Sequence, residues 1–188
     1  MMNLPNKLTV LRIVLTPVFL LLFLAEFIPY NYLYALIVFV IASITDAADG
    51  KIARKYNLIT NFGKIADPIA DKILVTSVLL CFMQLGLCSI WVLLIVLLRE
   101  FAVSAIRITA AAQGSVIPAN IYGKVKTVLQ MVFSILILLL LAVEDFITDT
   151  IPYLDVFAPV MMWILALITI FSGYVYVKDS FKVIDFKA

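Results

Sequence analysis

Residues 38–80 read VFVIASITDAADGKIARKYNLITNFGKIADPIADKILVTSVLL, and they place an acid-rich segment between two apolar runs. Asp46 and Asp49 close the first run, whereas Asp67 and Asp71 open the second. An ionised aspartate deep in a bilayer costs about 2.5–3.5 kcal/mol on insertion scales, so such acids are candidates for function. Four of them in one short segment indicate that this part of the chain carries the chemistry.

The rest of the chain is as apolar as these two runs. Hydrophobic residues make up 65% of the sequence and charged residues only 14%, whereas a soluble domain is nearer half apolar and a quarter charged. Runs near the length that crosses hydrocarbon as a helix occupy about 8–28, 31–48, 66–86, 88–110, 125–143 and 157–177. We predict an all-α, polytopic membrane protein with six transmembrane helices, forming a single domain over residues 1–188.

The placement of charge predicts the topology. When the six spans alternate, all fourteen Lys and Arg residues fall on one side of the membrane or in its half of a span, and the opposite connections contain acids but no basic residue. By the positive-inside rule, both termini and the acid-rich segment face the cytoplasm, as in a multi-pass protein of a bacterial inner membrane. A net charge of +2 and the lack of a basic strip with interleaved aromatics exclude nucleic acid as a partner.

The spacing of the acids predicts a metal site. Asp46 and Asp49 are three residues apart and Asp67 and Asp71 four apart, so each pair lies on one face of its helix. Like charges about 4 Å apart repel by roughly 4 kcal/mol at an effective dielectric of 20, and two divalent cations would neutralise four carboxylates. Because the chain has no histidine, oxygen ligands favour Mg²⁺ first and Mn²⁺ second. Paired metals of this kind clamp a phosphate during displacement at phosphorus.

These residues resemble the signature of the CDP-alcohol phosphotransferase family, D-x2-D-G-x2-A-R-x8-G-x3-D-x3-D, of which every fixed position is present from Asp46 to Asp71. The resemblance implies a six-helix membrane fold, commonly a homodimer, with the active site in a cytoplasm-facing cavity. It implies that two Mg²⁺ or Mn²⁺ ions are bound by Asp46, Asp49, Asp67 and Asp71, that Asp71 is also the catalytic base, and that the CDP-lipid lies against Gly50, Ala53, Arg54 and Gly63.

Three segments outside the motif narrow the resemblance to members that use glycerol 3-phosphate. They are NKLTVLR at 6–12, REFAVSAIR at 99–107 and GKVKT at 123–127. The resemblance then implies transfer of a phosphatidyl group from CDP-diacylglycerol to the 1-hydroxyl of sn-glycerol 3-phosphate, giving phosphatidylglycerophosphate and CMP. A dianionic acceptor needs a cationic pocket, for which the candidates are Arg107, Lys124 and Lys126, with Arg99 and Lys178 behind them.

Polar residues along the first and fourth predicted helices complete the set of candidates. Asn6, Thr9 and Arg12 recur every third residue and could form one stripe facing the cytidine or a phosphate of the CDP-lipid. Helix capping by Asn6 and snorkelling by Arg12 are the alternatives. Arg99 and Glu100 lie within the fourth predicted span, where we expect a buried pair that orients the pocket.

Three other functions compete with this one. Within the family, the acceptor could be phosphatidylglycerol, serine or an inositol phosphate. A divalent-cation transporter also keeps carboxylates inside a helical bundle, although it would want acids near the midplane, and here all four lie towards the basic side. A purely structural membrane scaffold would leave the motif unexplained.

Overall fold

The structure, a computed structural model, describes residues 3–56, 60–115, 120–147 and 154–181, leaving out the side chains of residues 47–51, 53–55, 61–62 and 64–65. Within these ranges it consists of six α-helices and contains no strand, which confirms the all-α prediction. The helices are α1 (Leu4–Leu24), α2 (Asn31–Lys55), α3 (Asn61–Gln84), α4 (Ile90–Ala112), α5 (Ile121–Ile147) and α6 (Leu154–Ser180).

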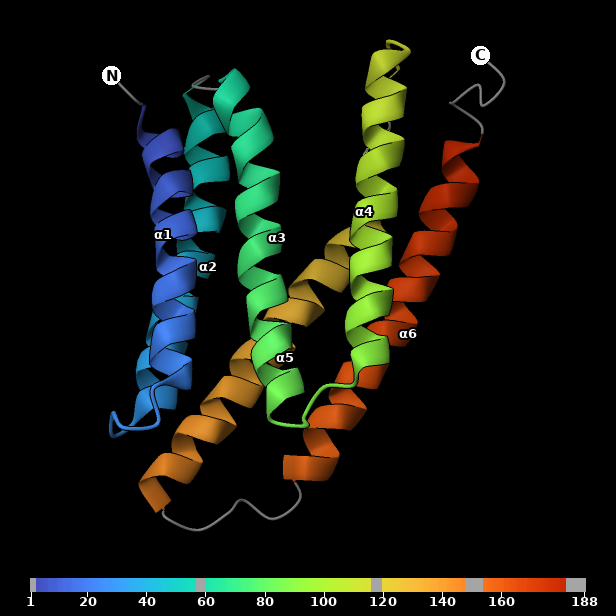
Figure 1. The fold of residues 1–188 in the computed structure, drawn as a ribbon. Coiled ribbons are helices and arrows are strands. Elements are labelled where there is room, and N and C mark those ends of the chain that lie inside the picture. The colour runs from blue at the N-terminus through green and yellow to red at the C-terminus, as the bar shows by residue number, and fades with distance from the viewer. Residues whose placement is uncertain (1–2, 57–59, 116–119, 148–153, 182–188) are drawn as a thin grey trace.

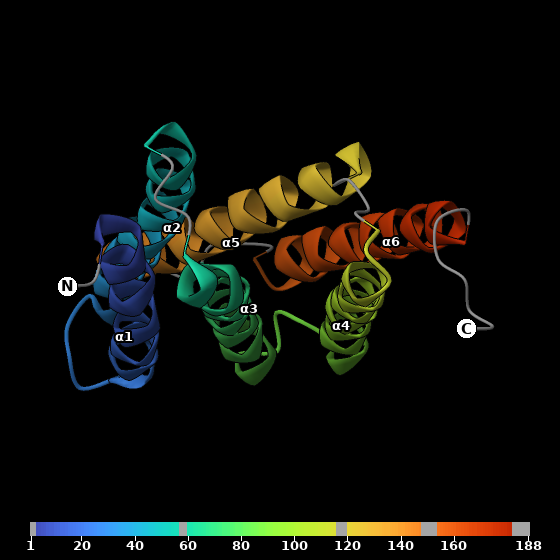
Figure 2. The same ribbon diagram turned by 90° about the horizontal axis from the view of Figure 1, so that it is seen from above.

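The helices form two groups that α5 connects (Figure 1). Helix α1 packs against α2 and α3 in the first group, and α4 packs against α6 in the second. Helix α5 runs diagonally between the groups, in contact with both α2 and α6. Seen from above, α3 and α4 project to the same side of α5 and α6, and they touch each other only sparsely (Figure 2).

The acid-rich motif lies at one end of this bundle. Helix α1 begins, α2 ends, α3 begins, and α4 and α6 end there (Figure 1), and we call it the motif end. Helix α2 continues to Lys55 and α3 begins at Asn61, so the helices extend beyond the predicted apolar runs. Thr60 caps α3, because its side chain accepts a hydrogen bond from the Gly63 amide at 3.0 Å.

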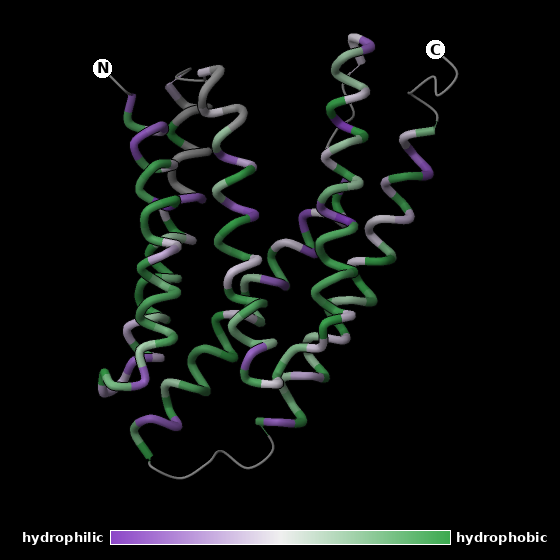
Figure 3. Tube along the Cα trace, in the orientation of Figure 1, coloured by the Kyte–Doolittle hydropathy of each residue, from purple (hydrophilic) through white to green (hydrophobic). Residues whose placement is uncertain are grey.

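Three helices meet the length and apolarity required to cross a membrane in the part of the chain that the structure describes, namely α1, α5 and α6. The bundle is apolar around most of its length (Figure 3). Large apolar side chains also point outward, as at Leu21, Trp91 and Leu167, which are 71%, 63% and 64% exposed. A surface of this kind is stable in lipid, which confirms a membrane protein. That all six helices span the membrane stays a prediction.

An aromatic core joins α1, α2 and α3 away from the motif end. Phe19 and Phe39 are fully buried, and their ring centroids lie 5.9 Å apart. Phe82, near the end of α3, is also fully buried. Close packing at this level holds the three helices together, so the polar faces at the motif end are placed on a rigid base.

Candidate active site

A buried polar stripe on α1 contacts both motif-bearing helices. Asn6, Thr9 and Arg12 follow one another at intervals of three residues and are only 8%, 0% and 0% exposed. The Thr9 hydroxyl donates a hydrogen bond to the Asp67 carboxylate on α3. The Arg12 guanidinium forms an ion pair with Asp46 on α2, at 2.5 Å. The predicted stripe is therefore present, and it faces the motif acids.

Asn6 fixes the position where α1 approaches the start of α3. The Thr60 hydroxyl donates to Asn6 Oδ1 at 2.8 Å, and a Cβ atom placed on Gly63 would lie 3.2 Å from the same oxygen. Only a residue without a side chain permits this approach without displacement. The capping alternative for Asn6 is wrong, because Asn3 caps α1 by accepting a hydrogen bond from the Asn6 amide at 3.1 Å.

Four motif residues lie on the last turns of α2, and their side chains fall outside the described part of the structure. For these four residues the structure therefore gives the course of the helix alone. The roles expected from the resemblance stay predictions for Asp49, Gly50, Ala53 and Arg54.

Asp71 stands between the acids and a group of cations. It follows Asp67 by one turn of α3 and lies within electrostatic reach of Asp46 and Arg12, and also of Glu100 and Lys126. Its Oδ1 atom is buried and has no hydrogen-bond partner among the described residues. Because buried carboxylate oxygens are almost always satisfied, this oxygen is free to receive a proton or a cation.

The donors present fit a hard divalent cation. No group of three acids that could hold a metal forms among the described side chains, and the fourth motif acid, Asp49, is not one of them. The described motif acids nevertheless lie on facing helices, and they offer only oxygen, as Mg²⁺ and Mn²⁺ require. The unsatisfied Oδ1 of Asp71 is the atom that most needs such a partner.

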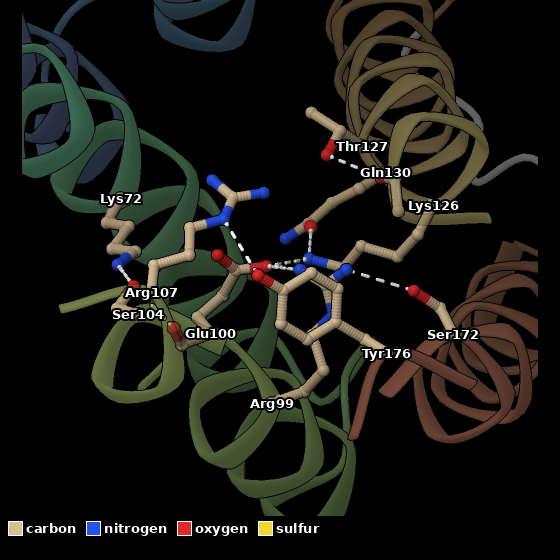
Figure 4. Close-up of polar contacts among 11 residues, drawn as sticks. Lys72, Arg99, Glu100, Ser104, Arg107, Lys126, Thr127, Gln130, Ser172 and Tyr176 are labelled. Carbon is tan, nitrogen blue, oxygen red and sulfur yellow. Dashed lines mark hydrogen bonds and ion pairs between the residues drawn. The ribbon is translucent and has the colours of Figure 1, made fainter. Parts of the chain in front are cut away.

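A second cluster joins α4 to α5 (Figure 4). One carboxylate oxygen of Glu100, Oε1, accepts from Arg99 Nη1 at 2.9 Å and from Lys126 Nζ at 2.9 Å. Lys126 Nζ also donates to Gln130 Oε1 at 2.5 Å. The lysine is only 2% exposed. The expected Arg99–Glu100 pair is therefore present, and Lys126 completes it from another helix.

Arg99 is fixed from the opposite side by α5 and α6. Its Nη2 atom donates to Ser172 Oγ at 2.9 Å. A Cβ atom on Gly123 would lie 2.8 Å from Nη2, and one on Gly173 would lie 3.1 Å from Cγ. The two glycines thus form a slot for the arginine, and its guanidinium is held by protein acceptors on both sides.

The remaining cations expected at the acceptor are exposed, in contrast to Lys126. Arg107 is exposed, with its Nε atom 3.3 Å from the Tyr176 hydroxyl and its guanidinium 5.7 Å from the centroid of that ring. Lys124 and Lys178 are exposed. Of the cations predicted for the acceptor, the structure places Lys126 alone, within the described residues, on the wall of the cavity that holds Asp71.

That cavity has a volume of about 700 Å³ and lies between α3, α4 and α5. Its lining combines the charged residues Asp71, Glu100 and Lys126 with apolar residues such as Leu80 and Val96. The polar lining residues include two that sequence reasoning did not single out, Lys72, which donates to Ser104, and Gln130. A signal for the second existed, because Lys126, Gln130 and Ser134 recur every fourth residue in α5 and are all buried.

Comparison with known proteins identifies relatives over nearly the whole chain. The sequence profile of the CDP-alcohol phosphatidyltransferase family matches residues 2–171. The chain is 38% identical over 196 residues to a CDP-diacylglycerol–glycerol-3-phosphate 3-phosphatidyltransferase of Bacillus subtilis, covering 97% of each chain. It is 44% identical over 178 residues to the protein of that name from Rickettsia typhi, covering 95% of this chain and 97% of the relative. A probable phosphatidylglycerophosphate synthase of Mycobacterium tuberculosis is 38% identical over 185 residues, covering 96% and 82%.

Proposed function

The chain belongs to the CDP-alcohol phosphatidyltransferase family, and from this premise we propose that it transfers the phosphatidyl group of CDP-diacylglycerol to glycerol 3-phosphate. The products are phosphatidylglycerophosphate and CMP. Support comes from relatives whose names state this activity and which match at 38–44% identity over nearly their full length.

The structural observation that carries the proposal is the position of Asp71. Its unsatisfied Oδ1 lies on the wall of the same cavity as Lys126, and the motif acid Asp46 acts on it electrostatically from α2. A base must have a free oxygen near both the metal-binding acids and the acceptor. Asp71 is the described residue that meets both conditions.

In the proposed reaction, Asp46, Asp49, Asp67 and Asp71 would hold two Mg²⁺ or Mn²⁺ ions, as in the prediction from the motif. When bound, these cations polarise the phosphoryl oxygens and neutralise charge that develops on the leaving group. Arg12 and Thr9 fix the carboxylates of Asp46 and Asp67 in orientation. The metal-binding acids are thereby set before substrate arrives.

Asp71 would accept the proton of the acceptor's 1-hydroxyl as that oxygen attacks the phosphorus that carries diacylglycerol. The bond from this phosphorus to the CMP oxygen then breaks, and CMP leaves. Lys126 would face the acceptor's phosphate, because it lines the cavity beside Asp71. Arg54, Gly50, Ala53, Gly63, Asn6 and Thr9 would line the site of the CDP-lipid, whose acyl chains remain in the bilayer.

The proposal includes six membrane spans in the cell membrane of a bacterium, with both termini and the active site towards the cytoplasm, and a homodimeric assembly. Two observations support the orientation. Helix α1 begins and α6 ends at the motif end (Figure 1), and the basic residues of the sequence gather on that side. The named relatives are bacterial proteins.

The test is CMP release by detergent-purified protein supplied with CDP-diacylglycerol and Mg²⁺. Glycerol 3-phosphate, serine, inositol phosphate and phosphatidylglycerol are offered one at a time. We expect release with glycerol 3-phosphate alone. Release with a different acceptor would keep the family and refute the acceptor, and a protein that binds CDP-diacylglycerol but releases no CMP with any acceptor would refute the enzymatic function.

Asp71→Asn provides a second test at the level of one residue. The amide keeps the size of the side chain but cannot take a proton, and general-base catalysis contributes typically 10²–10⁴-fold. CMP release should therefore fall by about 10²-fold or more while CDP-diacylglycerol still binds. Turnover at the normal rate would remove Asp71 from the role of base.

A further inference from the structure

We propose that Glu100 is a positioning residue that holds Lys126 against the phosphate of the acceptor, so that this pair makes the enzyme select phosphorylated alcohols over neutral ones. The inference rests on the proposed function and deepens it, because it assigns acceptor selection to one buried ion-pair cluster. Glu100 itself need not touch the substrate.

Lys126 keeps one hydrogen-bond donor for a ligand. An ammonium group has three N–H donors, and the described structure engages two of them, with Glu100 Oε1 at 2.9 Å and Gln130 Oε1 at 2.5 Å. The remaining donor belongs to a side chain that lines the cavity shared with Asp71. An anionic ligand in that cavity would accept the third hydrogen bond of Lys126.

The cluster around Glu100 has a net positive charge. Glu100 carries one negative charge, and three cations act on it, Lys126, Arg99 and Lys72. Asp71 adds a second negative charge beside Lys126, so three positive and two negative charges leave a local excess of one positive charge. A phosphate monoester carries up to two negative charges and is attracted by this excess, whereas a neutral alcohol such as inositol or a zwitterion such as serine is not.

The cluster is also held rigidly by contacts from three helices. The shared carboxylate oxygen of Glu100 is held from two directions, by Lys126 on α5 and by Arg99. Arg99 is in turn anchored to α6 through Ser172 at 2.9 Å, in the slot formed by Gly123 and Gly173. A buried lysine without such support would lose orientation and would cost free energy as an unpaired charge. The contacts therefore fix Lys126 before the acceptor binds.

The experiment compares Lys126→Met, Glu100→Gln and the double variant in the CMP-release assay, with KM measured separately for glycerol 3-phosphate and CDP-diacylglycerol. Loss of a charge-assisted hydrogen bond weakens binding by about tenfold or more. We expect both single variants to raise the KM for glycerol 3-phosphate by at least about that factor, with the KM for CDP-diacylglycerol within about threefold.

Thermal unfolding separates positioning from structural support. Glu100→Gln leaves the buried Lys126 without its carboxylate partner, so this variant should melt below the wild type, and the double variant should regain part of that loss. The double variant should not regain acceptor binding, because Lys126 is absent. Addition of glycerol 3-phosphate should raise the melting temperature of the wild type but not of Lys126→Met, a readout that requires no turnover.

Gly123→Ala tests the anchor without changing any charge. Its new Cβ atom would lie 2.8 Å from Arg99 Nη2, so the guanidinium must move and draw Glu100 with it. We expect a higher KM for glycerol 3-phosphate. The matched control is Val125→Ala, two residues along α5, where the side chain is 46% exposed and the KM should not change.

The failures of the two proposals are distinguishable. If the wild type uses an acceptor other than glycerol 3-phosphate, the proposed function is refuted. If it uses glycerol 3-phosphate but Glu100→Gln melts earlier with both KM values unchanged, Glu100 is structural only and the present inference is refuted. An unchanged acceptor KM in Lys126→Met would also overturn it.

Discussion

The ion pair between Arg12 and Asp46 should stabilise the bundle, and loss of Asp46 should cost more free energy of unfolding than loss of Arg12. The Arg12 side chain is fully buried, whereas that of Asp46 is 34% exposed. Removal of one partner from a buried pair costs about 3–5 kcal/mol, and Asp46→Asn should fall near the lower limit, about 3 kcal/mol, because water can reach part of the vacated site and Arg12 has a further interaction. For a chain of this length, a loss of about 3 kcal/mol lowers the melting temperature by roughly 6–12 °C.

Arg12→Met should cost less, about 1 kcal/mol, because the remaining carboxylate is partly hydrated. The double variant, Arg12→Met with Asp46→Asn, should recover to within about 1 kcal/mol of the wild type. Melting would be followed by the fluorescence of Trp91 and Trp163 in detergent containing EDTA, so that loss of metal binding by Asp46→Asn does not contribute.

The matched control for this experiment is Asp155→Asn, which neutralises an exposed acid in the first turn of α6 and should change stability by less than about 0.5 kcal/mol. Two results would refute the reasoning. One is an Asp46→Asn variant that melts with the wild type. The other is a double variant less stable than either single variant, since that would show no coupling between the charges.

Three further predictions concern the motif end. Thr9→Val removes the donor to Asp67 and should raise the Mg²⁺ concentration for half-maximal CMP release by about fivefold. Thr9→Ser keeps the hydroxyl and should leave that concentration unchanged. If both variants need the same Mg²⁺ concentration, Thr9 does not orient Asp67 for metal binding. Gly63→Ala places a Cβ atom 3.2 Å from Asn6 Oδ1 and 3.3 Å from Thr60 Oγ1, so the free energy of unfolding should fall by about 1–3 kcal/mol. An unchanged melting temperature would contradict that contact. EDTA should abolish CMP release and Mg²⁺ or Mn²⁺ should restore it; full activity in EDTA would refute the metal site.

Sequence reasoning predicted the number of helices but not their ends at the motif. The predicted spans excluded the most polar stretch between them, so the second span ended at 48, before Asp49, and the third began at 66, after Lys64. Backbone hydrogen bonds do not depend on that limit, and α2 continues to Lys55 while α3 begins at Asn61 behind the Thr60 cap. The motif acids therefore lie within helices, where the spacing of three and four residues has its expected meaning.

Spacing along one helix could be predicted from the sequence, whereas contacts between helices could not. The interval of three residues placed Asn6, Thr9 and Arg12 on one face, but their partners depend on how α1 packs against α2 and α3. The same limit applies to the cations. Arg107 and Lys126 were assigned to one pocket by charge alone, and the fold leaves Arg107 exposed beside Tyr176 while it buries Lys126.

The motif acids and the Glu100 cluster lie on different helices, which has a consequence for redesign. All four motif acids belong to α2 and α3, whereas Glu100, Arg99 and Lys126 belong to α4 and α5. The turn at 85–89 separates these halves in the sequence. A chimera joined in that turn would keep the part that activates the CDP-lipid and exchange the part that chooses the alcohol, so new head groups can be sought by varying only the second half of the chain.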